Sequence, residues 1–247
     1  MDRLIYTAMG GASRLMQQQA AVAQNLANVN TPGYRASIST FRSVPLVGEG
    51  LPTRAFVVDS TSGTNFSQGA MQATGNDLDV AVQGTGWIAL QMEDGSEAYT
   101  RNGNLQISPN GVLQTLGGIN VAGDSGPITI PPRTQVTIGK DGTISTVPTG
   151  ATPVPATVVG RIKLVNPPEA QIVRGEDGLF RTNDAGPAVP DANVTLASGT
   201  VEGSNVNTVE ALVSMISLSR MYDMQTQLIS SADNNEKSAS SVMQLNG

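Results

Sequence analysis

The C-terminal end of the sequence constrains the fold more than any other feature, because it reads as one very long helix. From Asn205 to Leu245 the chain contains neither proline nor glycine. Asn207 precedes Glu210 by three residues, as in a capping box at the start of a helix. A helix of this length runs about 60 Å, and its apolar side chains fall on more than one side. It therefore needs packing partners on several sides, unless it is the core helix of a single domain.

The N-terminal end predicts a second helix, over residues 3–28. Its apolar side chains recur every three or four residues, as in the seam of a coiled coil, and only Gln19 interrupts them. The pair Gly10 and Gly11 weakens the helix by about 1 kcal/mol per glycine, and it also permits close approach of a neighbouring helix. Pro32 and Gly33 lie just beyond the predicted end. The seam consists of Ile5, Met9, Ala12, Met16, Ala23 and Leu26.

The middle of the chain has a different character, with alternating apolar and polar residues separated by Asp-Gly and Asn-Gly pairs. These features predict a meandering antiparallel β domain. The fold class is therefore α+β, with two helical ends that pair and an inserted β-rich domain. The predicted hairpin turns are 93–96, 101–104, 109–111, 140–142 and 176–178. The predicted parts are an N-terminal helical part (1–35), an extended linker with short strands (36–74), a β-rich outer domain able to fold alone (75–195), and a C-terminal return with the long helix (196–247). Loops are predicted at 44–53 and 146–157.

Composition argues against several classes of partner. The net charge is −6 and no basic cluster is present, so nucleic acid and anionic membrane are poor partners. No apolar run approaches the roughly 20 residues that span a bilayer, and we expect no membrane insertion. The N-terminus lacks the pattern of a secretory signal peptide, so no cleavable signal is expected.

Catalytic chemistry finds little support in the sequence. Cysteine and histidine are absent, which removes the thiolate, the commonest general base and the commonest zinc ligand. Gly84, Gly86 and Ala89 formally match a dinucleotide fingerprint, but a predicted strand follows them instead of a helix. The Asp-Gly pairs lack the further acidic ligands of a calcium loop. We therefore expect no enzyme, no catalytic residue, no cofactor or metal site and no small-molecule substrate.

Three motifs carry a resemblance to the axial rod and hook proteins of the bacterial flagellum. The segment 24–35, QNLANVNTPGYR, is similar to the signature near the N-terminus of that family, although Gln24 replaces the usual asparagine. The segments 75–87, GNDLDVAVQGTGW, and 99–103, YTRNG, resemble the core of the family. The segment 202–207, EGSNVN, with Arg220 and Tyr222 downstream, resembles its C-terminal helix. The opening MDRLIYTAM and Trp87 favour a proximal-rod member.

The resemblance implies a structural subunit of the flagellar basal body. Such subunits use the flagellar export channel and polymerise into a tube that transmits torque and spans the periplasm. The implied partners are other copies of the chain and other rod proteins. A distal-rod member and an oligomeric surface adhesin remain the alternatives. The predicted assembly interface consists of Ile5, Met9, Ala12, Met16, Ala23, Leu26, Asn28, Tyr34, Asn205, Val209, Leu212, Ile216, Met221, Tyr222, Leu228 and Ile229.

Overall fold

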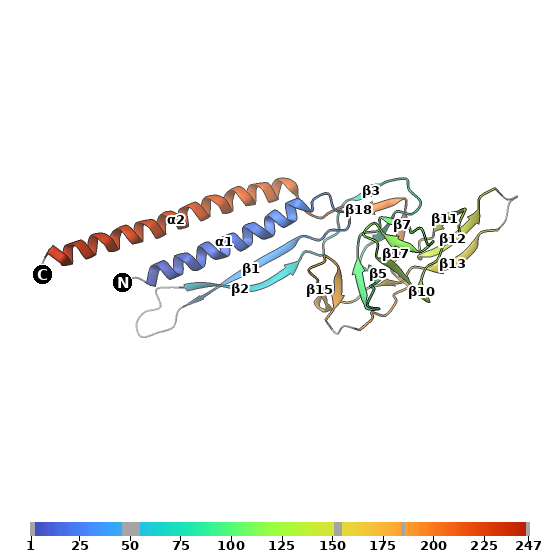
Figure 1. Ribbon diagram of the computed structural model, residues 1–247, viewed down its shortest axis with the longest axis horizontal. Coiled ribbons are helices and arrows are strands. Elements are labelled where there is room, and N and C mark those ends of the chain that lie inside the picture. The colour runs from blue at the N-terminus through green and yellow to red at the C-terminus, as the bar shows by residue number, and fades with distance from the viewer. Residues whose placement is uncertain (1–2, 46–54, 151–154, 184–185, 246–247) are drawn as a thin grey trace. The chain divides into compact units, whose positions relative to one another are not determined.

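The computed structural model in Figure 1 describes residues 3–45, 55–150, 155–183 and 186–245. The chain forms two compact units, and each unit takes residues from separate parts of the sequence. Unit 1 consists of Met1–Val29, Ala36–Asn65 and Val206–Gly247, and unit 2 consists of Asn30–Arg35 and Phe66–Asn205. Unit 1 holds both helices and unit 2 is built from β-strands. The predicted α+β class with an inserted antiparallel β domain is confirmed.

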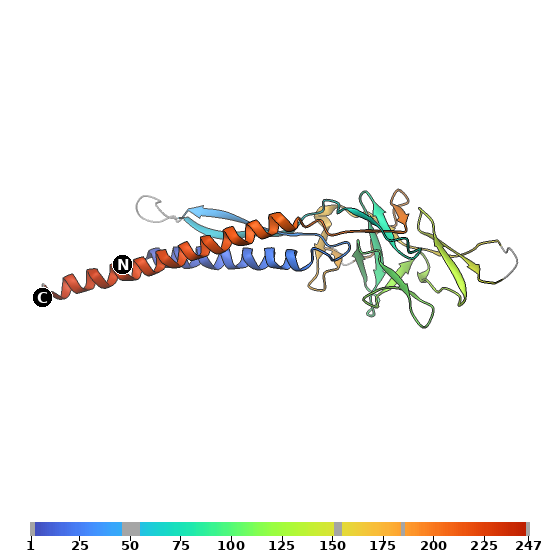
Figure 2. The same cartoon turned by 90° about the horizontal axis from the view of Figure 1, so that it is seen from above.

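Two long helices dominate unit 1. They are α1 (Arg3–Ala27) and α2 (Thr208–Leu245), and they pack along each other, as Figures 1 and 2 show. The Asn207 side chain caps α2, since its Oδ1 accepts hydrogen bonds from the backbone N–H groups of Val209 (3.1 Å) and Glu210 (3.3 Å). At the end of α1, Asn28 Nδ2 donates to the carbonyl oxygen of Gln24 at 2.9 Å.

A long β-hairpin completes unit 1. Its strands β1 (Ser37–Pro45) and β2 (Ala55–Thr64) pair antiparallel, with one irregularity between Thr40 and Phe41, and both strands contact α1. The sequence predicts only short strands in this linker, because serine and threonine hide the apolar alternation. Asn25 of α1 fixes the start of β1, because its side chain both accepts from and donates to the backbone of Ser37, at 2.8 and 2.9 Å. Most of the loop predicted at 44–53 lies outside the described residues, as does the middle of the loop predicted at 146–157.

Unit 2 is built from short antiparallel strands. Its largest sheet has the order β15-β16-β6-β5-β9-β8-β7, with β10 on β9 and β14 on β5; the smaller sheets are β11-β12-β13, β17-β4 and β18-β3. The elements are β3 (Met71–Ala73), β4 (Val80–Gln83), β5 (Trp87–Gln91), β6 (Glu97–Thr100), β7 (Leu105–Ile107), β8 (Leu113–Thr115), β9 (Asn120–Gly123), β10 (Gly126–Pro127), β11 (Thr134–Ile138), β12 (Thr143–Pro148), β13 (Thr157–Arg161), β14 (Leu164–Val165), η1 (Glu169–Gln171), β15 (Ile172–Arg174), β16 (Phe180–Thr182), β17 (Thr195–Ser198) and β18 (Thr200–Glu202).

Four of the predicted turns close hairpins. They join β5 to β6, β7 to β8, β11 to β12 and β15 to β16. The turn predicted at 101–104 is wrong as a hairpin, because β6 pairs with β5 and β16 whereas β7 pairs with β8. Gly103 serves another purpose there, since a Cβ atom would overlap the carbonyl oxygen of Val80. An Asn-Gly pair thus marks a close backbone approach at this site.

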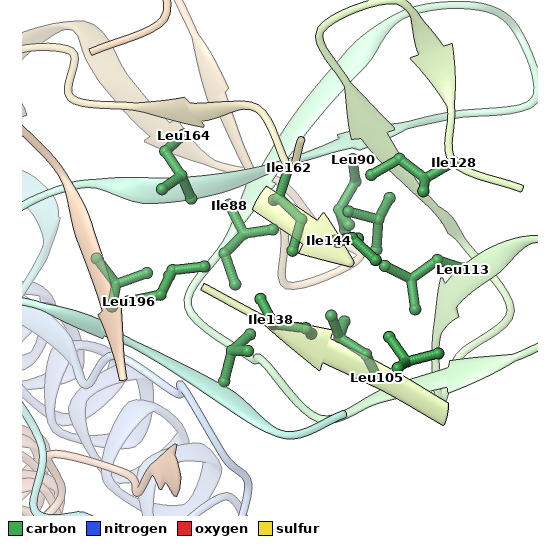
Figure 3. Packing of buried hydrophobic residues seen from close by; sticks show 14 of the residues in the cluster. Ile88, Leu90, Leu105, Leu113, Ile128, Ile138, Ile144, Ile162, Leu164 and Leu196 are labelled. Carbon is green, nitrogen blue, oxygen red and sulfur yellow. The ribbon is translucent and has the colours of Figure 1, made fainter. Parts of the chain in front are cut away.

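The core of unit 2 is formed by alternating residues of these strands. Ile88, Leu90, Leu113, Ile144 and Leu196 are fully buried and belong to one apolar cluster, shown in Figure 3. A second, aromatic cluster contains Trp87, Tyr99 and Phe180. Phe66 packs its ring edge on Trp87, with a centroid separation of 6.0 Å.

Candidate assembly interface

The two helices of unit 1 meet along a seam that includes several small residues. On α2 the buried residues Ala211, Leu218 and Ala232 are spaced by multiples of seven, and Gln225 completes the series. A Cβ atom added to Gly11 of α1 would lie 3.2 Å from Gln225 Nε2, so α1 approaches α2 closely at this glycine. A seven-residue repeat of seam positions is the pattern of coiled coils. The predicted pairing of the helical ends therefore exists within one chain.

The residues of the seam predicted on α1 differ in their burial. Ala8, which is buried, and Gly11 lie on the side that packs within the subunit. Met9 and Met16 lie outside the contact with α2, and their side chains are 55 % and 57 % exposed. Ala23 is also exposed, while Ile5, Ala12 and Leu26 are half-buried. The Met9–Met16 side of α1 is therefore left uncovered in the single subunit.

This uncovered side of α1 has its own coiled-coil spacing. Tyr6, Met9, Met16 and Ala23 are exposed and share one face, because the intervals between them are combinations of three and four residues. We call these four residues the outer stripe. An apolar stripe at this spacing is the surface that a further helix packs against.

Helix α2 also exposes apolar residues, on two different sides. Val209, Leu212 and Ile216 are 71 %, 45 % and 56 % exposed in its first turns. Further along, Met221 and Leu228 are exposed on another side. The remaining predicted residues of this helix, Tyr222 and Ile229, are half-buried. They lie one helical turn after the seam residues Leu218 and Gln225, and therefore next to the seam.

A groove in unit 1 is lined by residues of both helices and of the hairpin. Its volume is about 420 Å³. Phe41 and Val57 of the hairpin line it together with Leu15 of α1 and Met224 and Leu228 of α2. On the other face of the hairpin Ile38, Val44 and Val58 are exposed. Every element of unit 1 therefore presents apolar side chains to its surroundings.

Three predicted interface residues lie away from these surfaces. Tyr34 is buried in unit 2, where the Arg174 guanidinium lies 4.4 Å from the centre of its ring. Asn205, also in unit 2, is half-buried and donates from Nδ2 to the carbonyl oxygen of Ser67 at 2.9 Å. Asn28 is half-buried at the end of α1. Their placement within the subunit gives each of them an intramolecular role that the sequence motifs alone do not reveal.

Two other kinds of functional feature are not expected from the sequence, a metal site and a membrane span. Within the described part of the chain, no three or more acidic, cysteine or histidine side chains are grouped so as to hold a metal ion. No described helix has both the length and the apolar character needed to cross a membrane. Gly84 and Gly86, from the apparent dinucleotide fingerprint, adopt positive φ angles of 76° and 127° in the turn between β4 and β5.

Comparison with known proteins gives matches along most of the chain. The family model "Flagella basal body rod protein" matches residues 5–35, "Flagellar hook protein FlgE/F/G D1 domain" matches 81–146, and "Flagellar basal body rod FlgEFG protein C-terminal" matches 197–242. The flagellar basal-body rod protein FlgF of Escherichia coli (strain K12) is 45 % identical, over 99 % of this chain and 100 % of its own length. The chain belongs to the flagellar basal-body rod protein family.

Two further relatives of this rod protein carry the same description. FlgF of Salmonella typhimurium (strain LT2) is 44 % identical over 99 % of this chain and 100 % of its own length. FlgF of Caulobacter vibrioides is 34 % identical over 97 % of each chain. The predicted member, a proximal-rod protein of the FlgF kind, is thereby confirmed in preference to the distal-rod and adhesin alternatives. The protein is a structural subunit of the basal-body rod and not an enzyme, and it assembles with other rod subunits.

Proposed function

We propose that this rod subunit polymerises through the apolar surfaces of unit 1. The observation that carries the proposal is the outer stripe of α1, because Tyr6, Met9 and Met16 are all more than half exposed. Each large apolar side chain that moves from water into an interface contributes roughly 1.5–3 kcal/mol. The exposed apolar residues of α2 and of the hairpin add further surface of the same kind. Neighbouring copies and other rod proteins are the occupants of these surfaces.

The geometry of the surfaces favours an open, repeating assembly. Apolar residues are exposed on the outer stripe of α1 and on two different sides of α2, so one subunit has surface for more than one neighbour. Repeated head-to-tail contacts between such surfaces build rings or helical filaments. We propose that the product is the tubular shaft of the rod, which transmits torque across the periplasm and encloses the export channel. The β-rich unit 2, which has a complete core of its own, would form the outer part of each subunit.

Paired substitutions at adjacent helical positions test this proposal. Met16→Asp and Ile216→Asp place a carboxylate in the proposed interfaces, whereas Gln17→Asp and Ser217→Asp place one at exposed neighbouring positions. A carboxylate without a partner in a packed interface costs about 3 kcal/mol or more. Cells that produce Met16→Asp or Ile216→Asp should export the subunit, fail to complete rods and fail to swim. Leu26→Asp and Leu228→Asp are expected to act in the same direction.

The two control variants should leave swimming unchanged, because the intrinsic helix propensity of aspartate is the same at adjacent positions. The fluorescence of Trp87, which lies in the core of unit 2, reports whether unit 2 is still folded in each purified variant. Normal swimming with Met16→Asp and Ile216→Asp would show that these surfaces remain in solvent in the rod, and would contradict the proposal.

A further inference from the structure

A buried ion cluster brings together the three sequence motifs, which are far apart in the chain. Glu202, the last residue of β18, is fully buried in unit 2. Its Oε1 atom lies 2.7 Å from Arg35 Nη1, and its Oε2 atom accepts a hydrogen bond of 3.1 Å from Arg101 Nη1. The side chains of both arginines are at most 5 % exposed. We call Glu202, Arg35 and Arg101 the Glu202 cluster.

Backbone groups around the cluster are tied to the same glutamate. The N–H of Gly69 donates to Glu202 Oε1 at 2.8 Å, and the N–H of Gly33 donates to the carbonyl oxygen of Glu202 at 2.7 Å. A Cβ atom on Gly69 would overlap the carbonyl oxygen of Gly203, so the backbones of these two segments lie in close contact. Close by, the N–H of Asn205 donates to the carbonyl oxygen of Tyr34 at 3.3 Å.

The segments that Glu202 joins are those through which the chain enters and leaves unit 2. The chain passes between the units at 29/30, 35/36, 65/66 and 205/206. Gly33 and Arg35 lie between the first two passages, and Gly69 follows the third by four residues. Glu202 itself precedes the fourth, which leads into α2. The carboxylate and the backbone carbonyl of Glu202 together therefore bring segments next to all four passages to one place in unit 2.

The electrostatics of the cluster indicate a role in specifying geometry. Burial lowers the pKa of Arg101, and the nearby charge of Arg35 lowers it further, while the charge of Glu202 acts in the opposite direction. The Nε atoms of both arginines are buried and have no hydrogen-bond partner among the described residues. Apolar residues of similar volume often stabilise a protein as well as a buried ion cluster does, whereas removal of one partner is strongly destabilising. Such a cluster restricts which segments can meet, because each charge needs its partner.

We propose that the Glu202 cluster is a positioning site for rod assembly. It holds the segment that follows α1 against the segment that precedes α2 within unit 2, so that the two segments leave this unit together. Because they leave together, α1 and α2 of one chain stay at a high effective concentration for each other. All three side chains are buried within unit 2. The incorporation step in cells depends on the assembly function proposed above, whereas the local structural effect does not.

Amide hydrogen exchange on the purified full-length chain tests the local effect. In Glu202→Gln the backbone N–H groups of Gly33 and Gly69 should exchange about tenfold faster or more, because the passages separate locally. The N–H groups of Ala89 and Ile162, which are bonded to Lys163 and Gly142 elsewhere in unit 2, should keep their rates. Equal acceleration at all four amides, or no acceleration at any, would overturn the proposal.

Glu97→Gln is the matched control. It also removes a carboxylate from an ion pair of unit 2, since Glu97 Oε1 lies 2.6 Å from Lys163 Nζ, but this pair is remote in sequence from the passages. The exchange rates of Gly33 and Gly69 should not change in this variant. Acceleration equal to that of Glu202→Gln would overturn the proposal. If Glu202→Gln does not fold, Arg35→Lys takes its place, because lysine keeps the charge and loses the planar fork of arginine.

Incorporation in cells tests the positioning role. Ile144→Val removes one methylene from the core of unit 2 and destabilises it without touching the cluster. Glu202→Gln should be exported and fail to enter rods, while Ile144→Val and Glu97→Gln should enter rods normally. Normal incorporation of Glu202→Gln, or an equal failure of Ile144→Val at equal thermal stability, would overturn the positioning role. The outer-stripe variants should leave the exchange of Gly33 unchanged, so failure of either proposal can be distinguished from failure of the other.

Discussion

At the scale of single residues, Gly33 in the TPGY motif has two reasons to be glycine. Its φ angle is 69°, in the left-handed region, and a Cβ atom would overlap the backbone of Arg101 and Asn102. Gly33→Ala should therefore lower the free energy of unfolding of unit 2 by about 3 kcal/mol. Gly84→Ala is the matched control, since Gly84 has a φ of 76° but open space around its Cβ position. It should cost only about 1 kcal/mol. Urea unfolding measures the free energy of unfolding of both variants. Equal losses of stability would show that the positive φ angle alone, and not the steric overlap, causes the destabilisation.

Hairpin aspartates make the stability of unit 2 depend on pH. Asp141 Oδ2 accepts a 2.6 Å hydrogen bond from the Thr143 hydroxyl, and Oδ1 accepts one from the Thr143 N–H; these bonds lower the pKa of Asp141. The bonds from Arg181 lower the pKa of Asp177 in the same way. A carboxyl group whose pKa is lower in the folded state adds stability above its unfolded pKa of about 3.9. That contribution is lost as the pH falls through the folded pKa.

Thermal unfolding should consequently show little change from neutral pH down to about pH 5 and a loss of stability below about pH 4. Thr143→Val removes the hydroxyl that bonds Asp141, so the pKa of Asp141 should rise towards its ordinary value and the acid-dependent loss should shrink. NMR titration of the Asp141 carboxyl carbon measures this directly. An unchanged titration curve in Thr143→Val would contradict the assignment to the hydroxyl bond.

At the scale of elements, the pairing of α1 with α2 rests on little buried surface. The buried apolar residues that the structure shows in the two helices are Ala8, Ala211, Leu218 and Ala232, and only Leu218 has a large side chain. Gly10 and Gly11 weaken α1 further. We therefore predict that both helices are only marginally formed in the free subunit and become fully ordered on incorporation, with neighbours covering the outer stripe. Strong amide protection in α1 and α2 of a dilute monomer would contradict this.

The sequence predicts the helices well because their signals are local. Asn207 gives the start of α2, and the absence of proline and glycine gives its length. The sequence does not reveal which face of α1 packs against α2, because small residues occur on several sides of α1. In the structure α1 contacts α2 at Gly11, and the larger side chains of Met9 and Met16 are exposed. Strands β1 and β2 escape detection for a related reason: serine and threonine occupy positions where alternation would require apolar residues.

At the scale of the whole molecule, we predict that a β domain longer than residues 75–195 is the more stable fragment. A fragment of residues 75–195 lacks Glu202 and ends at the first residue of β17, the partner of β4. A fragment of residues 66–205 keeps these elements and also Phe66, which packs on Trp87. The longer fragment should unfold cooperatively at a midpoint well above that of the shorter one, because an unpaired buried arginine costs about 3 kcal/mol or more. Circular dichroism during heating measures both, and equal midpoints would contradict the extension.

The convergence of the motifs is the part of the molecule that sequence reasoning misses. TPGYR, YTRNG and EGSNVN each stand out as motifs, but local patterns say nothing about contacts between residues a hundred or more positions apart. Arg35 and Glu202 differ in sequence by 167 positions and meet at 2.7 Å. A buried pair of this kind is visible only after the strands have been placed, because the sequence offers several acidic partners for each arginine.

The gathering of all four chain passages at Glu202 has a consequence for how such subunits diversify. When the chain enters and leaves a domain within one small region, which we call its footprint, the domain can be exchanged as a whole. Its strands can lengthen, shrink or be replaced through recombination, provided that the footprint is preserved. The helical ends then retain their sequence and their neighbours while the outer part acquires new dimensions. For protein engineering, a foreign β domain grafted between Gly69 and Thr200 should be tolerated only where it supplies a buried arginine in the place of Arg101, the partner of Glu202 that lies within the exchanged segment.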